Sequence, residues 1–358
     1  MSESTYAGIA PMNPYLNEVL TLTKPKQDYI ADLAFPVMSI QNMIGATDRD
    51  DEKLRGLNRV RFWVEALQER IADSAEDGFV GPYDYRRDLD LSDMSYKELE
   101  MKEWARQVPI AQQIRRSSQE PTDDTVRATL KLANNLYLRR EHMMRDLCLN
   151  SFTAINWVAI TDGSGVQLGG AGAKGLFDLR RAINQYAATN LGLRPDLMIL
   201  GELEANALEL DLNSLGVVGD DADGPVGKTY PMSRAQLITF LEGQLGLRVL
   251  VGSAYGNSAH RGKTAVNGLV WSGIFLGHSG SSYDGQSLIG PPSSFNKGIN
   301  GEGVYMDTTS LLNVRHYNDV PGLYARDDGR VNFTTLDASF NMAIVNANLG
   351  LQINSCIA

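Results

Sequence analysis

Cysteine is scarce in this sequence, and so are other residue types on which common functions depend. The 358 residues include only two cysteines and four histidines. A disulfide framework is therefore not expected, and we predict a reducing compartment in which Cys148 and Cys356 are free, buried residues. No apolar run approaches the roughly eighteen residues that cross a membrane, so no membrane partner is expected. The first residues lack the basic and apolar regions of a secretion signal, and none is predicted.

Basic charge is also in short supply. Lysine and arginine together number 33 against 43 aspartates and glutamates, which gives a formal net charge of −10. This balance disfavours a chain whose main task is to grip phosphate backbones, because that task requires clustered lysine and arginine. It leaves open the enclosure of nucleic acid, since a negatively charged wall repels packed DNA and lets it slide. The hydrophobic content of 43% and the charged content of 21% are ordinary for a folded soluble protein.

Two glycine-rich motifs resemble nucleotide-binding sites only in part. Gly170–Gly175 has the spacing of a dinucleotide fingerprint, but the acidic residue near the required distance, Asp196, comes at the start of a strand rather than at its end. Residues 224–229 resemble the end of a Walker loop, yet Pro225 removes one N–H group that would cradle phosphate, and nearby aspartates would repel it. An ordinary bend and an acidic loop are the favoured interpretations.

Metal and nucleophile patterns are missing as well. The four histidines share no metal-ligand spacing, and the aspartates at 220–223 lack the glutamate that an EF-hand loop requires. Neither cysteine has a local catalytic signature, and no nucleophile elbow is present. We therefore predict no catalytic, cofactor-binding or metal-binding residue and no cofactor. The chain is interpreted as a structural protein rather than an enzyme.

The most informative stretch runs from Tyr96 to Asn150, where an extended arm with alternating charges leads into one long helix. Thr122 is expected to be the N-cap, and the two aspartates after it favour the positive end of the helix dipole. Apolar residues recur three and four positions apart and predict one apolar stripe: Val126, Leu130, Ala133, Tyr137, Met144 and Leu147. Such an arm and helix are hard to bury in one compact monomer, so neighbouring molecules are expected to cover them.

The other elements are predicted from periodicity and from end signals. Residues 29–40 are expected to begin as a helix and to become a strand after Pro36. A second amphipathic helix is expected over 48–75, and a strand over 152–160. The remaining predictions are helices at 176–191, 202–212 and 233–245 (capped by Ser233 and stopped by Gly246), strands at 197–200, 248–251 and 269–271, a long loop at 279–303, and two strands between 331 and 358.

Several stretches, taken in order, carry a family resemblance: Tyr29–Val37, Tyr83–Ser92 with Ser95–Glu100, Leu136–Glu141, Pro195–Gly201 and Asn346–Ile353. In this order they resemble the end of the N-terminal arm, the extended loop, the spine helix, the start of the axial domain and the last peripheral strands of one family. That family is the major capsid proteins of tailed bacteriophages, whose shell-forming fold is shared with encapsulins. No single motif is specific, and the likeness rests on the series.

The resemblance implies an α+β fold with five parts in sequence. These are an N-terminal arm (1–32), an extended loop region (33–118) with a helical insertion near 48–75, a peripheral domain (119–194) with the spine helix 122–150, an α/β axial domain (195–318), and return strands of the peripheral domain (319–358). The 83–110 loop is expected to lie across an adjacent subunit. Deleting it is expected to leave a folded monomer that makes no shells.

The resemblance also implies the function and the partners. Copies of the chain would form pentamers and hexamers of an icosahedral shell that encloses double-stranded DNA without sequence-specific binding. The protein would be made in the bacterial host cytoplasm and end in the virion. A separate scaffolding protein, a portal and a decoration protein are the other implied partners. The alternatives are an encapsulin-like compartment and a nucleotide-binding enzyme that uses the bend at 163–175.

Some relatives carry a covalent cross-link between a loop lysine and an asparagine of the peripheral domain. Under the resemblance, Lys97 or Lys102 with Asn346 or Asn348 would take these roles.

Overall fold

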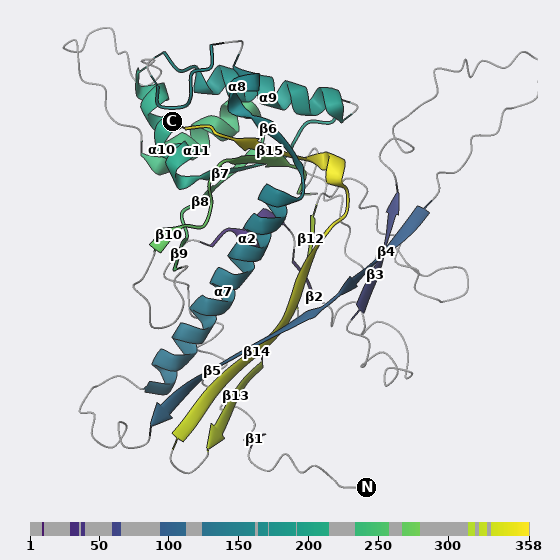
Figure 1. The fold of residues 1–358 in the computed structure, drawn as a ribbon, viewed down its shortest axis with the longest axis vertical. Coiled ribbons are helices and arrows are strands. Elements are labelled where there is room, and N and C mark those ends of the chain that lie inside the picture. The colour runs from purple at the N-terminus through teal and green to yellow at the C-terminus, as the bar shows by residue number, and fades with distance from the viewer. Residues whose placement is uncertain are drawn as a thin grey trace, which may run out of the picture.

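In the computed structural model, the chain builds two large β-sheets, and the long helix α7 (Asp124–Asn150) runs along one and reaches the other (Figure 1). The two cysteines are free and buried, as predicted. The structure describes residues 9–10, 29–35, 37–39, 59–65, 94–111, 124–161, 164–170, 172–190, 192–214, 233–257, 267–279, 314–318, 322–327 and 331–357.

The first sheet has five strands and draws on distant parts of the chain. Their order across the sheet is β6 (Thr153–Asn156), β15 (Gly350–Asn354), β11 (Ile274–Gly277), β7 (Leu197–Gly201) and β8 (Arg248–Gly252). The two outer pairs, β6 with β15 and β7 with β8, are parallel, and β11 is antiparallel to both of its neighbours. Every residue of β7 is buried, because both faces of the sheet are covered.

Alternate residues of β7 serve two different cores, since successive side chains of a strand point to opposite faces. Met198 and Leu200 pack in the core beneath the helices, and Leu197 and Ile199 pack on the other face with Met144 of α7. The helices lie together at the top of Figure 1: α8 (Trp157–Ile160), α9 (Gly175–Thr189), α10 (Glu202–Ser214) and α11 (Arg234–Leu245).

The ends of α11 follow the predicted capping. The Ser233 hydroxyl accepts the N–H of Gln236 at 3.4 Å, and the Gln236 side chain accepts the N–H of Ser233 at 2.8 Å, which forms a capping box. Gly246 then adopts a left-handed conformation with φ of 68°, which glycine permits without a Cβ clash. Both signals are local, so the sequence was sufficient to predict them.

The second sheet has six strands around the long strand β14 (Val331–Ile344). Antiparallel to one edge of β14 runs β5 (Lys102–Ala111). The other edge pairs first with β13 (Gly322–Asp327) and then with β12 (Val314–Asn318), and the sheet is completed by β1 (Ile9–Ala10) on β13 and β2 (Val37–Ser39) on β12. The two predicted C-terminal strands are thus confirmed as β14 and β15, although they enter different sheets.

Helix α7 packs its apolar side on the six-stranded sheet. Leu132 and Leu136 join Leu323, Leu336 and Phe340 in one buried cluster. Of the apolar stripe predicted for this helix, Ala133 and Met144 are buried and the other four residues are half-buried, so the buried side is turned from the predicted one and includes Leu132 and Leu136. The described helix begins at Asp124, so the expected N-cap lies outside the described residues.

The helix predicted over 48–75 is wrong for residues 59–65, which form strand β3 (Arg59–Glu65). This strand pairs antiparallel with β4 (Met94–Glu100), and within the described residues the pair joins no other sheet. Val60 and Val64 lie four positions apart and fit both periods, but Phe62 between them completes a period of two. Alternating β-branched and aromatic residues favour a strand.

Two further predictions need adjustment, and two predicted loops are not tested. The strand expected over 152–160 ends at Asn156, whose side chain accepts the N–H of Val158 at 3.1 Å and caps α8. The strand expected over 269–271 is β10 (Asn267–Leu269), which pairs with β9 (Tyr255–Asn257). The loops at 83–92 and 280–303 lie outside the described residues.

The five-stranded sheet and its helices draw on residues from both sides of positions 195 and 319. Strand β6 and helices α8 and α9 precede residue 195, and β15 follows residue 319, yet all of them build the same layer as β7. The reason is that β15 returns to the sheet between β6 and β11. In the described part of the chain, no helix has the length and apolar character to cross a membrane.

Candidate assembly site

A buried carboxylate on α7 ties three distant segments together. Oε2 of Glu141 accepts the backbone N–H groups of Ile30 at 3.0 Å and Ala31 at 2.9 Å, at the start of the short helix α2 (Ala31–Ala34). Oε1 of Glu141 accepts the indole N–H of Trp271 at 2.5 Å. All three hydrogen bonds span more than a hundred residues of sequence. Glu141 thus holds the N-terminal segment against both α7 and the five-stranded sheet.

Burial dominates the ionisation of this carboxylate. Glu141 has no exposed surface, and loss of hydration raises its pKa from 4.5 to about 7. The three N–H donors act in the opposite direction, because they favour the charged form, and the charge of Asp32 adds a smaller upward effect. The Glu141 carboxylate is therefore partly protonated near neutral pH.

The neighbouring residue of α7 makes a second tie to the same segment. Arg140 is 4% exposed, forms an ion pair with Asp32 at 3.2 Å, and places its guanidinium 5.3 Å from the ring centre of Phe340 in β14. One turn away, Tyr137 stacks on Tyr29 with ring centres 5.9 Å apart. Residues 29–35, which we call the anchored segment, thus contact α7 through a ring pair, an ion pair and a carboxylate.

The contacts of this arrangement are suited to holding the anchored segment in place on α7. The donors are backbone N–H groups and one indole, and the acceptor carboxylate has no access to solvent. An unpaired buried donor costs about 1–3 kcal/mol, so release of the anchored segment would be expensive unless new partners appear. Glu141 was quoted in the family resemblance, but its partners Ile30, Ala31 and Trp271 had no sequence signal that would link them.

The strand pair β3–β4 is the second assembly feature, and it extends away from both large sheets (Figure 1). Its register places Arg59 opposite Glu100 and Glu65 opposite Met94. The chain then continues through Met101 into β5, which is part of the six-stranded sheet. The outlying part of the expected 83–110 loop therefore ends at about Glu100, and Lys102–Ile110 belong to the body of the protein.

The glycine-rich bend is packed against α10 by a carboxylate. Asp211 accepts the N–H of Gly169 at 2.9 Å, and a Cβ on Gly175, the first residue of α9, would lie 3.0 Å from its other oxygen. A dinucleotide site would place an anionic pyrophosphate at this helix N-terminus. Burial raises the pKa of Asp211 to about 6, and the carboxylate already occupies the neighbourhood of the bend. The geometry disfavours the nucleotide alternative.

Asp196, the other half of the dinucleotide pattern, has a structural partner. Its carboxylate accepts the backbone N–H of Ser279 at 2.6 Å and the Ser279 hydroxyl at 3.1 Å, beside the buried ring of His278. The residues of the Walker-like stretch 224–229 and of the acidic cluster 220–223 lie outside the described residues. Among the residues that are described, no group of three potential ligands could hold a metal ion.

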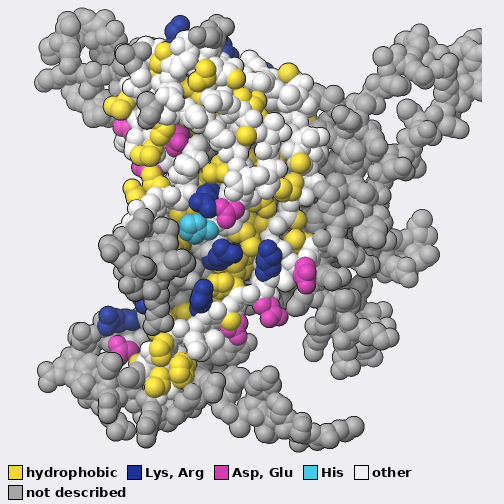
Figure 2. Space-filling view, in the orientation of Figure 1, with side chains coloured by type: hydrophobic (Ala, Val, Ile, Leu, Met, Phe, Trp, Pro, Cys, Tyr) yellow, Lys and Arg dark blue, Asp and Glu magenta, His cyan; other side chains and the backbone are white. Residues whose placement is uncertain are grey.

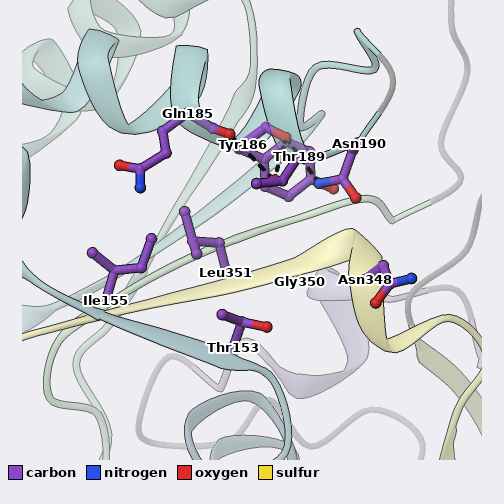
Figure 3. A pocket seen from close by; sticks show the side chains of 9 residues that line it. All are labelled: Thr153, Ile155, Gln185, Tyr186, Thr189, Asn190, Asn348, Gly350 and Leu351. Carbon is purple, nitrogen blue, oxygen red and sulfur yellow. Dashed lines mark hydrogen bonds between the residues drawn. The ribbon is translucent and has the colours of Figure 1, made fainter.

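A small cavity of about 120 Å³ lies between the C-terminal half of α9 and strands β6 and β15 (Figure 3). Thr153, Ile155 and Leu351 line it from the sheet, and Thr189 and Asn190 line it from the helix. The one acid–base group in its lining is the Tyr186 phenol, which donates to the carbonyl of Leu349 at 2.7 Å. The other polar groups of its lining are hydroxyls and amides, and it holds no carboxylate, imidazole or thiol.

Comparison with known proteins identifies the fold. No family model matches the sequence, and no curated protein matches it either. Among solved structures, the chain is similar to a phage-related protein from Bordetella bronchiseptica RB50, with a TM-score of 0.56, 14% identity and 97% of each chain covered. It is also similar to the capsid of Myoviridae phage XM1, with a TM-score of 0.51, 10% identity, and 92% of this chain and 93% of that chain covered. The mixed α+β capsid fold implied by the resemblance is confirmed.

Proposed function

We propose that this chain is the major capsid protein of a tailed bacteriophage, and that its copies assemble as pentamers and hexamers into an icosahedral shell around double-stranded DNA. The observation that carries the proposal is the match to the capsid of phage XM1, which spans nearly the full length of both chains. An added catalytic domain would leave a large part of one chain unmatched. The proposed location is the virion, after synthesis in the host cytoplasm.

The domain roles of the capsid family form part of the proposal. Helix α7 and the six-stranded sheet would be the peripheral domain, with α7 as the spine helix. The five-stranded sheet and its helices would be the axial domain, and β3–β4 would be the outlying part of the extended loop. The anchored segment would end the N-terminal arm. These assignments rest on the order of the elements and on the way each sheet is built.

A scaffolding protein, a portal and a decoration protein are proposed as partners because a DNA-filled phage shell commonly requires them. The encapsulin-like compartment remains the second candidate, since it shares the fold. An enzyme at the glycine bend is disfavoured by the Asp211 carboxylate beside the N-terminus of α9.

The first experiment examines purified full-length protein by size-exclusion chromatography and negative-stain electron microscopy, with and without a candidate scaffolding protein. We expect capsomers or closed shells. A compact monomer under every condition would contradict the proposal. The same material on a denaturing gel tests the cross-link between Lys97 or Lys102 and Asn346 or Asn348, since a monomer band alone would exclude it.

A sharper experiment removes the β3–β4 pair and keeps the body of the protein. Residues 60–99 are replaced by Asn-Gly, because Arg59 and Glu100 are register partners and lie about 5 Å apart at Cα, a gap that a two-residue turn closes. We expect a folded protein that no longer forms shells, since the pair would bridge neighbouring subunits. Circular dichroism and thermal unfolding check the fold, and electron microscopy checks assembly.

The matched control replaces only residues 66–93 by Asn-Gly, which joins the register partners Glu65 and Met94 and retains both strands. Comparing the two variants separates the effect of the strand pair from that of the residues between its strands. Normal shells from the 60–99 replacement would contradict the bridging role.

A further inference from the structure

The exposed side of α7 carries a row of basic residues in a protein whose net charge is −10. The row consists of Arg127, Lys131, Arg139, His142 and Arg145, and we call it the α7 cationic row. The first three are exposed, and His142 and Arg145 are half-buried. Dark blue and cyan side chains gather along this helix in Figure 2, and the magenta acidic side chains lie mostly beside them.

Helical geometry places the row on one side. Lys131 and Arg139 lie eight residues apart, and Arg145 lies six residues further, so the row from Lys131 to Arg145 is about 21 Å long at 1.5 Å per residue. At about 100° per residue, Arg127, Lys131, His142 and Arg145 fall within about 60° of one another, and Arg139 lies about 60° further round, toward the side of Leu132. The row therefore forms a band of positive charge along the helix axis.

Acidic neighbours on α7 are confined to the ends of this row. Asp124 pairs with Arg127 at 3.7 Å, and Asp146 pairs with Arg145. Between these two aspartates the one acidic residue of α7 is Glu141, which is fully buried on another side. Lys131 and Arg139 form no ion pair with any residue that the structure describes. The middle of the row has an unbalanced positive charge.

The pKa of His142 is lowered, in part by the positive charge of the row. Burial lowers it first, and the charges of Arg145 and Arg139 lower it further, against an opposing effect of Asp146. The row also lacks the apolar component of a protein interface, because no large hydrophobic side chain of α7 is among the exposed ones. Protein interfaces have apolar and aromatic centres, whereas a phosphate backbone is bound by charge alone.

We propose that the α7 cationic row is the surface that contacts the phosphate backbone of the enclosed duplex DNA. This inference rests on the proposed function and adds to it the side of the subunit that faces the genome. A duplex carries one negative charge per about 1.7 Å of axis, so a row of this length meets several phosphates. The acidic remainder of the subunit repels the backbone, which keeps contacts few and DNA mobile.

The test compares three full-length proteins: wild type, the row variant Lys131→Glu/Arg139→Glu, and the control Lys174→Glu/Arg180→Glu. The control changes the net charge equally, but its exposed residues lie at the N-terminus of α9 and within that helix. Fluorescence anisotropy of a labelled duplex measures binding to the unassembled fraction as salt rises, and circular dichroism checks folding. Electron microscopy records shell formation separately.

Each phosphate contact contributes about 0.9 to the slope of log affinity against log salt. We expect wild type and control to share one slope and the row variant to lose roughly two contacts, or about 1.8 of slope. Equal slopes for all three proteins, or no binding by wild type, would overturn the inference. Loss of shells from the row variant with unchanged DNA binding would also overturn it and assign the row to contacts between copies. Failure of wild type to form shells counts instead against the proposed function.

Discussion

The two large sheets of this protein are stabilised in different ways. The five-stranded sheet has a continuous apolar core under α9, α10 and α11, and its central strand β7 is buried along its whole length. The six-stranded sheet takes strands from residues 9–10, 37–39, 102–111 and the last third of the chain, and packs apolar side chains against α7. Buried polar groups then tie α7 to the anchored segment. Both sheets draw on remote segments, but the first is held by apolar packing, whereas the contact of α7 with the anchored segment depends on buried polar groups as well.

Under the proposed function, this difference suggests which part of the subunit stays rigid in the shell and which part adapts. Apolar packing is insensitive to pH and is lost only when the core opens. A buried carboxylate with three donors responds to protonation and depends on each partner being in place. The anchored segment and α7 belong to the second kind of structure, and neighbouring subunits are proposed to meet at the strand pair β3–β4.

The largest effect is expected from a cavity in the apolar layer. Leu200→Ala removes a fully buried side chain from β7 and should lower the free energy of unfolding by about 2–5 kcal/mol. The matched control is Leu210→Ala on α10, where the side chain is 64% exposed and the change should be small. Urea unfolding followed by circular dichroism measures both. Similar losses for the two variants would contradict the role of the apolar core in stabilising the five-stranded sheet.

A somewhat smaller loss in the free energy of unfolding is expected when the Glu141 carboxylate is removed. Glu141→Ala leaves the N–H groups of Ile30 and Ala31 and the indole of Trp271 without their acceptor, and we expect a loss of about 3 kcal/mol. The control Glu209→Ala removes a partly exposed carboxylate from α10. Limited proteolysis should show earlier cleavage before residue 36 in Glu141→Ala alone. Unchanged protection there would mean that the anchored segment is held by other contacts.

The smallest effect expected is a dependence on pH. The pKa of Glu141 is about 7 in the folded protein and 4.5 as its ordinary value, so the folded state binds the proton more tightly between these values. The free energy of unfolding should therefore fall as pH rises through this window, by roughly 2 kcal/mol from pH 5 to pH 8, and level off above it. Denaturation of wild type and Glu141→Gln across this range measures the difference.

The pKa of Asp211 is also raised, to about 6. The comparison of wild type with Glu141→Gln therefore isolates the contribution of Glu141. A parallel pH dependence in both proteins would assign the effect to Asp211 or to other groups. An increase in stability toward pH 8 that depends on Glu141 would contradict the sign of the shift.

Much of the secondary structure was predictable because its signals are local. The capping box at Ser233, the left-handed Gly246 and the alternation in β14 and β15 act within a few residues. The same reasoning gave the wrong element for residues 59–65, because valines four positions apart are compatible with a helix as well as with a strand. The pairing partner β4, about thirty residues later in the sequence, favoured the strand.

The sequence by itself determined an acidic, cysteine-poor protein with one long amphipathic helix, and the order of its elements was enough to indicate the capsid fold. The tertiary structure decided that β15 returns to the sheet of β7, that Glu141 accepts bonds from Ile30, Ala31 and Trp271, and that the basic side of α7 remains exposed. The physical reason is separation along the chain. A period or a cap is set by neighbours in sequence, whereas a shared sheet and a buried carboxylate depend on which distant segments meet when the apolar surfaces close.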